Sequence, residues 1–97
     1  MNATVISDTE ARDNLAANLH CILQVRGLTQ QQVATATSRP LMLINNAFNG
    51  RNRPGAALVL CLGEAFGYTS EELLGPPEIV AIRERLRSTR KSSLIPA

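Results

Sequence analysis

Apolar side chains recur along most of this chain at the spacing of an α-helix. The first stripe follows the i, i+4, i+7, i+8 pattern of one helix face and consists of Leu15, Leu19, Ile22 and Leu23. Ser7 and Glu10 can form a capping box before this stripe, and Gly27 stops it. We therefore expect a first helix between these signals, preceded by a loose N-terminus.

Residues 28–50 read as two short helices joined by a tight turn. Thr29 and Gln32 supply a capping box for the first of them. Pro40 lacks an N–H and has a fixed φ, so it suits the first turn of a new helix but not the interior of an old one. The apolar side of the second helix consists of Leu41, Ile44, Ala47 and Phe48. An Asn-Gly pair at 49–50 ends it, because both residues tolerate the left-handed conformation.

The following segment contains signals for two more helices. A fourth helix should run from about Pro54 to Phe66 and end at Gly67. Its apolar stripe consists of Ala57, Leu58, Cys61, Leu62 and Ala65. Thr69 and Glu72 form a third capping box, which opens a short fifth helix through Leu74.

A sixth helix is expected after the stop signal Gly75-Pro76-Pro77. One side of it is lined by Ile79, Ile82 and Leu86. A stripe this thin suits packing on the bundle or pairing with a second copy. Residues 88–97 show no periodicity, so we expect them to fray.

These elements indicate an all-α fold, because no stretch alternates as a strand would and no repeat is present. A chain of 97 residues can bury one modest core. We expect a compact bundle of five short helices plus a C-terminal sixth helix. Pro76-Pro77 marks a boundary between residues 1–76 and a C-terminal helix and basic tail at residues 77–97.

The segment 28–50 resembles the helix-turn-helix of the repressor/Cro (XRE-like) family. The matching residues are Leu28, Thr29 and Gln30 at its start, Ala34 where the helices cross, inward-pointing Ile44, and Asn49-Gly50 at its end. The family usually has Gly at the tight turn, where this chain has Ser38. The likeness covers about residues 10–75. It implies a bundle of the lambda-repressor-like type that binds double-stranded DNA, with the second helix of the motif in the major groove.

The resemblance also implies which side chains contact DNA. Gln30 would hold a phosphate at a helix N-terminus, where the helix dipole favours an anion. Arg51 and Arg53 would extend the backbone contact that Asn49 and the Gly50 amide begin, although a solvated loop is the alternative for both arginines. The complete predicted set is Gln30, Gln31, Arg39, Leu41, Met42, Asn45, Asn46, Asn49, Arg51 and Arg53.

The base-reading positions depart from the usual pattern of bidentate Gln or Arg readers. Arg39 could read guanine or hold a phosphate. Asn45 and Asn46 could read adenine, or could simply be surface amides. Leu41 and Met42 can only meet thymine methyls or fit the groove by shape, so the same apolar tip could instead bind a protein.

The layout of charge favours an anionic partner. Net charge is only +2, but Asp13 is the last acid before Glu64. The interval holds Arg26, Arg39, Arg51 and Arg53. Phosphates repel carboxylates, and an arginine that binds a phosphate releases counterions from DNA, which strengthens binding. A DNA-facing surface therefore needs a region with arginines and without acids. Chance clustering in a small chain is the alternative.

Other chemistry is sparse. Cys21 and Cys61 lie within helical apolar patterns, which favours reduced core thiols over a disulfide. His20 is expected at the surface or its boundary rather than in catalysis. We expect no metal, no cofactor and no enzyme activity. Cyanases are enzymes with a similar-looking helical N-terminal region, but too little chain follows residue 75 here for their catalytic half.

We therefore expect a transcription regulator, acting as a homodimer on a two-fold-symmetric site. A helix-turn-helix-like protein-interaction module, or the antitoxin of a toxin–antitoxin pair, is the alternative. An antitoxin would need a toxin-binding segment, which only the N-terminus or the sixth helix could supply. The chain has no signal peptide and no apolar run of membrane length, so we expect a cytoplasmic protein without a membrane partner.

Overall fold

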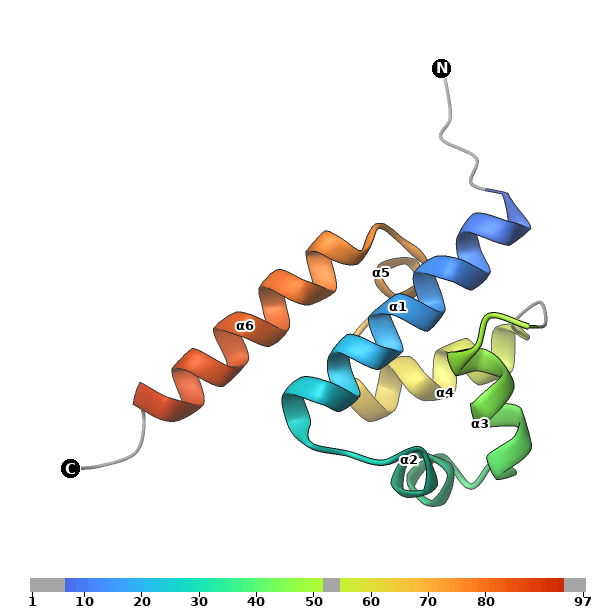
Figure 1. Cartoon of the computed structure of the whole chain (residues 1–97), viewed down its shortest axis with the longest axis horizontal. Helices are drawn as coiled ribbons and strands as arrows, with labels where there is room; N and C mark the ends of the chain where they lie inside the picture. The colour runs from blue at the N-terminus through green and yellow to red at the C-terminus, as the bar shows by residue number, and fades with distance from the viewer. Residues whose placement is uncertain (1–6, 52–54, 94–97) are drawn as a thin grey trace.

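In the computed structural model, residues 7–51 and 55–93 are described, with side chains as far as residue 88, and they form six helices and no strand. The helices are α1 (Asp8–Arg26), α2 (Gln30–Thr37), α3 (Leu41–Phe48), α4 (Ala56–Phe66), α5 (Ser70–Leu74) and α6 (Pro77–Ser93). In Figure 1, α6 runs beside α1 in the same direction, while α3 lies on the other side of α1. The prediction of an all-helical bundle is confirmed.

The three predicted capping boxes and the glycine stops of α1 and α4 are confirmed, whereas Pro77, predicted as part of a stop, is the first residue of α6. Left-handed glycines end α1 and α4, with φ of 67° at Gly27 and 83° at Gly67. Each of the three capping boxes is present, and they pair Ser7 with Glu10, Thr29 with Gln32, and Thr69 with Glu72. These contacts satisfy amides that a helix N-terminus would otherwise leave without partners.

The core is aliphatic and gathers around α1. Its most deeply buried apolar side chains include Leu15, Leu19, Ile22, Ile44, Phe48, Leu62 and Leu73. Asn18 lies among them without any exposed surface. Its Nδ2 donates to the carbonyl of Leu73 at 2.7 Å, and Asn14 donates in the same way to Leu74 at 3.0 Å. Two asparagines of α1 thus cap the carbonyl end of α5, which no residue of α5 itself can do.

The predicted face of α4 is wrong by one position. The helix begins at Ala56, after Gly55 as N-cap, and the predicted first-turn residue Pro54 lies outside the described residues. The side chains turned inward belong to Leu58, Val59, Leu62, Gly63 and Phe66, whereas Ala57 and Ala65 are exposed and Cys61 is half-buried. A Cβ at position 63 would overlap the carbonyl oxygen of Tyr68. Only this face lets the chain after Gly67 pass close over α4.

Of the two roles expected for the thin apolar stripe of α6, packing on the bundle is wrong. Ile79, Ile82 and Leu86 are 44%, 56% and 57% exposed, so this stripe does not pack on the bundle. The inward face instead centres on Val80 and Glu84, which are 0% and 1% exposed. Glu84 is charged, so the apolar periodicity of the sequence does not indicate that it is buried. The helix also continues to Ser93, through residues that were expected to fray.

Glu84 is held by a buried polar cluster that ties α6 to α1. Arg26 donates to both carboxylate oxygens, with Nε to Oε1 at 2.9 Å and Nη2 to Oε2 at 2.8 Å. The Tyr68 hydroxyl donates to Oε2 at 2.5 Å. Burial opposes the charge on Glu84, but the bonds from Arg26 and Tyr68 outweigh it and lower the pKa of the carboxyl. Burial and the same carboxylate raise the pKa of Tyr68, so its hydroxyl stays protonated.

Neither cysteine forms a disulfide, and both are half-buried rather than part of the core. Burial, followed by the charge of Glu84, raises the pKa of the Cys21 thiol. No group of three metal-ligating side chains gathers anywhere in residues 7–51 and 55–88. None of the described helices is both long enough and apolar enough to span a bilayer.

Candidate nucleic-acid interface

The turn between α2 and α3 is built on a left-handed serine. Ser38 has φ 55° and ψ 39°, and among the described residues no other residue except glycine has a positive φ. The next amide, of Arg39, donates to the carbonyl of Ala34 at 3.0 Å and closes the end of α2. Ser38 therefore takes the conformation that glycine adopts most readily, at the position where the resembled family usually has glycine.

One side of α3 packs inward and its first turn points outward. Ile44, Ala47 and Phe48 are buried, as predicted. Phe48 contacts α1 through His20, whose Nε2 lies 2.9 Å from the Phe48 carbonyl oxygen and whose ring meets the Phe48 ring edge-on. This places His20 at the surface boundary, as expected.

The outward turn of α3 carries an apolar tip, which we define as Leu41, Met42 and Leu43. Their exposed fractions are 44%, 74% and 38%. Leu41 shares the apolar side of α3 with Ile44 in the sequence, but it is exposed like Met42, as expected for a base-reading position. The reason is that the contacts of α3 with α1 come from the end of α3 rather than its first turn. Leu43 was not among the predicted site residues. Its signal in the sequence was the unbroken apolar run 41–44, which one helix face cannot bury.

A chain of side-chain amides connects α3 to the N-terminus of α2. Asn49 donates from Nδ2 to Oδ1 of Asn45 at 3.0 Å. Asn45 in turn donates from Nδ2 to Oε1 of Gln30, also at 3.0 Å. Gln30 is the first residue of α2. The structure thus joins three predicted site residues in one hydrogen-bonded row, which we call the amide row.

The N-terminus of α2 is open for an anion. Thr29 uses its hydroxyl to accept from the Gln32 amide, and the Gln32 side chain accepts from the Thr29 amide. In the part of the chain that the structure describes, the backbone N–H groups of Gln30 and Gln31 have no acceptor. Two backbone N–H groups are therefore available where the helix dipole favours negative charge.

The remaining predicted residues surround this row. Arg39 is half-buried in the turn, and Asn46 is half-buried on α3. The Asn46 carbonyl accepts from the amide of Arg51 at 3.1 Å, which holds the exposed Arg51 just after α3. Arg53 lies outside the described residues. Among the residues that are described, neither Arg39 nor Arg51 forms a salt bridge, so neither charge is neutralised by a close carboxylate.

Two residues of α1 that the sequence did not indicate meet the end of α3. Arg12 donates from Nη1 to the Arg51 carbonyl at 3.5 Å. The Asp13 carboxylate lies beside Gly50, because a Cβ at Gly50 would be 3.7 Å from its Oδ1. The region without acids in the sequence is therefore not without acids in space. No local pattern announces this contact, since the residues are nearly forty positions apart.

No protein-family model matches this chain, and neither a curated protein nor a solved structure does. The function is therefore inferred from the geometry of the site. That geometry comprises the amide row, the open N-terminus of α2, the apolar tip and the charges at the end of α3.

Proposed function

We propose that this protein is a sequence-specific DNA-binding transcription regulator of the lambda-repressor-like type, with α3 as the helix that enters the major groove. The observation that carries the proposal is the amide row. It holds side chains on the outer side of α3 in register with the N-terminus of α2. Phosphate contacts orient a protein on DNA and base contacts give specificity. A sequence-specific protein therefore needs its phosphate-binding and base-reading groups held in a fixed position relative to each other.

The residues divide into two groups by their chemistry. The amides of Gln30 and Gln31, with Arg51 and the predicted Arg53, suit phosphate oxygens. Asn46 has no side-chain partner in the described chain and suits the paired donor and acceptor of adenine.

The side chains at the start of α3 complete the base-reading side. The exposed tips of Leu41 and Met42 suit thymine methyls. Arg39, in the turn before them, can reach a guanine edge or a phosphate.

A single copy offers one short helix, which reads too few base pairs for tight specificity. The proposal therefore includes a homodimer on a two-fold-symmetric operator, with one α3 in each half-site. A cytoplasmic location belongs to the same proposal, because that is where the protein would meet its DNA.

The decisive experiment is selection of bound sequences from random double-stranded DNA by the full chain at low salt. A palindromic consensus is expected. Asn46→Ala should lose preference at one base pair of each half-site, by about 1–3 kcal/mol, and leave nonspecific binding nearly intact. Absence of any enriched sequence at low salt would refute the proposal. A uniform loss at all positions in Asn46→Ala would refute the role of Asn46.

The exposed apolar tip of α3 favours a second candidate, a module that binds a protein. Met42 is the most exposed of the large apolar residues in the described chain, and methionine adapts readily to varied partners. In this candidate the tip docks on a partner protein, such as the toxin of a toxin–antitoxin pair. It predicts that purified protein shows no sequence preference on DNA and that changes in the tip abolish partner binding.

A further inference from the structure

The outer side of α6 carries an apolar surface with no partner in the described chain. Ile79, Ile82 and Leu86 form this surface, which we call the α6 stripe, and all three are about half exposed. They lie on the side of the helix opposite to buried Val80 and Glu84. Their spacing of three and then four residues is that of a and d positions, which in other helices form the seam of a helix pair.

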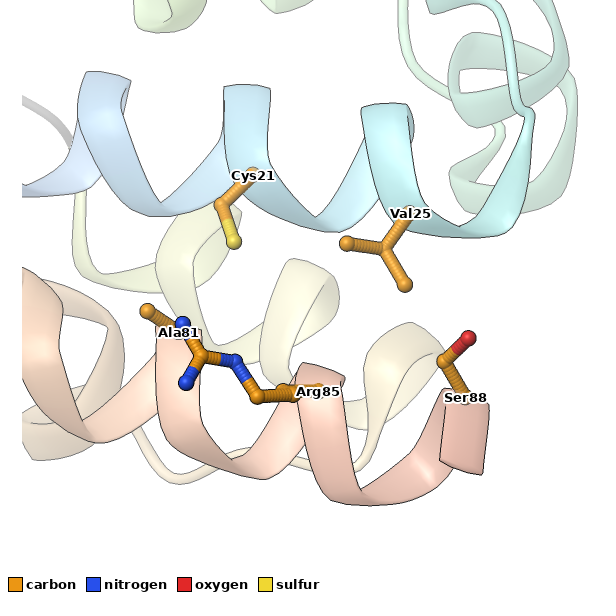
Figure 2. A pocket seen from close by; sticks show the side chains of 5 residues that line it. All are labelled: Cys21, Val25, Ala81, Arg85 and Ser88. Atoms are coloured by element: carbon orange, nitrogen blue, oxygen red, sulfur yellow. The ribbon is translucent and has the colours of Figure 1, made fainter. Parts of the chain in front are cut away.

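The apolar surface continues from α6 across a groove to α1. This groove has a volume of about 420 Å³ and is lined by Cys21, Val25, Ala81, Arg85 and Ser88. Figure 2 shows Val25 facing α6 across the groove, and the Arg85 side chain running back along α6 toward Ala81. Val25 is itself 42% exposed. The groove thus borders the α6 stripe on the flank where Arg85 lies.

We propose that this surface binds a second copy of the chain, with the two α6 helices paired antiparallel through their α6 stripes. Charge complementarity along α6 favours a second copy as the partner. Glu78 and Arg85 are seven residues apart and lie on one flank of the stripe, while Arg83 and Arg87 lie on the other. In an antiparallel pair like flanks meet, so Glu78 of each copy faces Arg85 of the other.

The parallel arrangement is disfavoured by the same charges. A parallel pair would place the flank with Glu78 and Arg85 against the flank with Arg83 and Arg87. Three arginines would then meet one glutamate, and the arginines would repel one another. Arg83 is moreover already bound, by Glu72 at 2.6 Å and over the Tyr68 ring. Glu78 and Arg85 form no salt bridge within the described part of a single copy, so both are available to a second one.

The size of the surface determines how strong the pairing can be. Three residues per copy bury less than the ~1,200 Å² of a standard stable interface, so a dissociation constant in the micromolar range is expected. In Figure 1, α3 lies on the far side of α1 from α6, and pairing through α6 leaves both apolar tips uncovered. The pairing is therefore compatible with DNA binding but does not require it.

Sedimentation equilibrium of the full chain without DNA tests the pairing. A monomer–dimer equilibrium with a dissociation constant between about 10 µM and 1 mM is expected, as for a small interface. Leu86→Gln should raise the dissociation constant at least about tenfold, equivalent to about 1.4 kcal/mol of lost burial. Leu60→Gln is the matched control, because Leu60 on α4 is 58% exposed against 57% for Leu86. It should leave the dissociation constant unchanged.

The orientation is tested by exchanging charges. Glu78→Arg and Arg85→Glu should each weaken the dimer, and the double variant should restore it. A chain that remains monomeric at the highest concentration would overturn the pairing, and so would equal weakening by Leu60→Gln. Failure of the double variant to recover would overturn the antiparallel arrangement. These measurements contain no DNA, so their failure is distinguishable from failure of the DNA-binding proposal.

Discussion

Asn45 on α3 donates a hydrogen bond of 3.0 Å to the side-chain oxygen of Gln30, the first residue of α2. The bond links the side of α3 that would read bases to the end of α2 that would hold a phosphate. Residues linked in this way are expected to act as one unit.

The first prediction is that Gln30→Ala and Asn45→Ala are non-additive in DNA affinity. A double-mutant cycle on a selected operator should give a coupling energy of about 0.5–3 kcal/mol. Gln31→Ala is the matched control, because Gln31 is exposed, adjacent, and without a bond to α3 among the described contacts. Its cycle with Asn45→Ala should be additive to within about 0.5 kcal/mol. A coupling no larger than that of the control would mean that the hydrogen bond plays no part in binding.

The second prediction concerns the charges at the end of α3. Arg51→Ala should weaken binding to all duplexes alike and reduce the salt slope by about 1. Asp13→Asn should strengthen binding to all duplexes by about 0.5 kcal/mol, the repulsion between unit charges roughly 8 Å apart in water. Glu71→Gln is the control, because it makes an equal change of charge at an exposed residue of α5, and it should have little effect on DNA affinity. An unchanged salt slope in Arg51→Ala would show that this loop points away from DNA.

The third prediction concerns the apolar tip. Leu41→Gln/Met42→Gln should remain folded, because both side chains are already exposed. We expect its selected DNA sequence to change at the thymine positions. Ile44→Gln is the opposite case, because Ile44 has no exposed surface. Burying the side-chain amide of the new glutamine should destabilise the fold by about 3 kcal/mol or more. If the double variant keeps its DNA preference but loses a partner protein in pull-downs, the tip is a docking surface instead.

The fourth prediction concerns the left-handed turn. Ser38→Gly should raise the free energy of unfolding by about 0.5 kcal/mol, because it relieves a side chain at φ 55° but increases the freedom of the unfolded chain. Ser38→Val should lower the free energy of unfolding by about 1 kcal/mol or more, since a β-branched residue is strained at positive φ. Urea unfolding followed by circular dichroism measures both. Equal stability of the two variants would be inconsistent with the observed turn.

The fifth prediction is a pH dependence that resides in Glu84. Its pKa in the folded state lies below the ordinary value of 4.5, because the bonds from Arg26 and Tyr68 outweigh the effect of burial. Its contribution to stability is therefore complete above the unfolded pKa and is lost as pH falls through the folded pKa. Glu84→Gln should cost about 3 kcal/mol at pH 7, since it removes one partner of a buried ion pair.

The advantage of the natural chain over Glu84→Gln should then shrink as pH falls below about 4.5. Glu72→Gln provides the control, because Glu72 pairs with Arg83 at an exposed position and glutamine preserves the capping box. Its effect at pH 7 should be far smaller. A difference between Glu84→Gln and the natural chain that does not vary with pH would show that the carboxylate is not charged in the fold.

Sequence by itself determined the features that depend on near neighbours. Capping pairs such as Ser7 with Glu10 lie three residues apart, and a left-handed glycine such as Gly27 needs only its own missing Cβ. The stripe of α1 was also identified correctly, because four large apolar residues at helical spacing allow only one inward face. The starts of the six helices could be predicted to within about two residues, but α6 continues to Ser93, past residue 88 where fraying was expected.

The tertiary structure decided which faces meet. On α4, two apolar faces one position apart are locally equivalent, and the close approach of Tyr68 to Gly63 selected one of them. On α6, burial of Glu84 is favourable only because Arg26, 58 positions away, supplies two hydrogen bonds. The amide row and the approach of Asp13 to Gly50 likewise join separate helices. Such contacts depend on the path of the whole chain, and no local pattern encodes them.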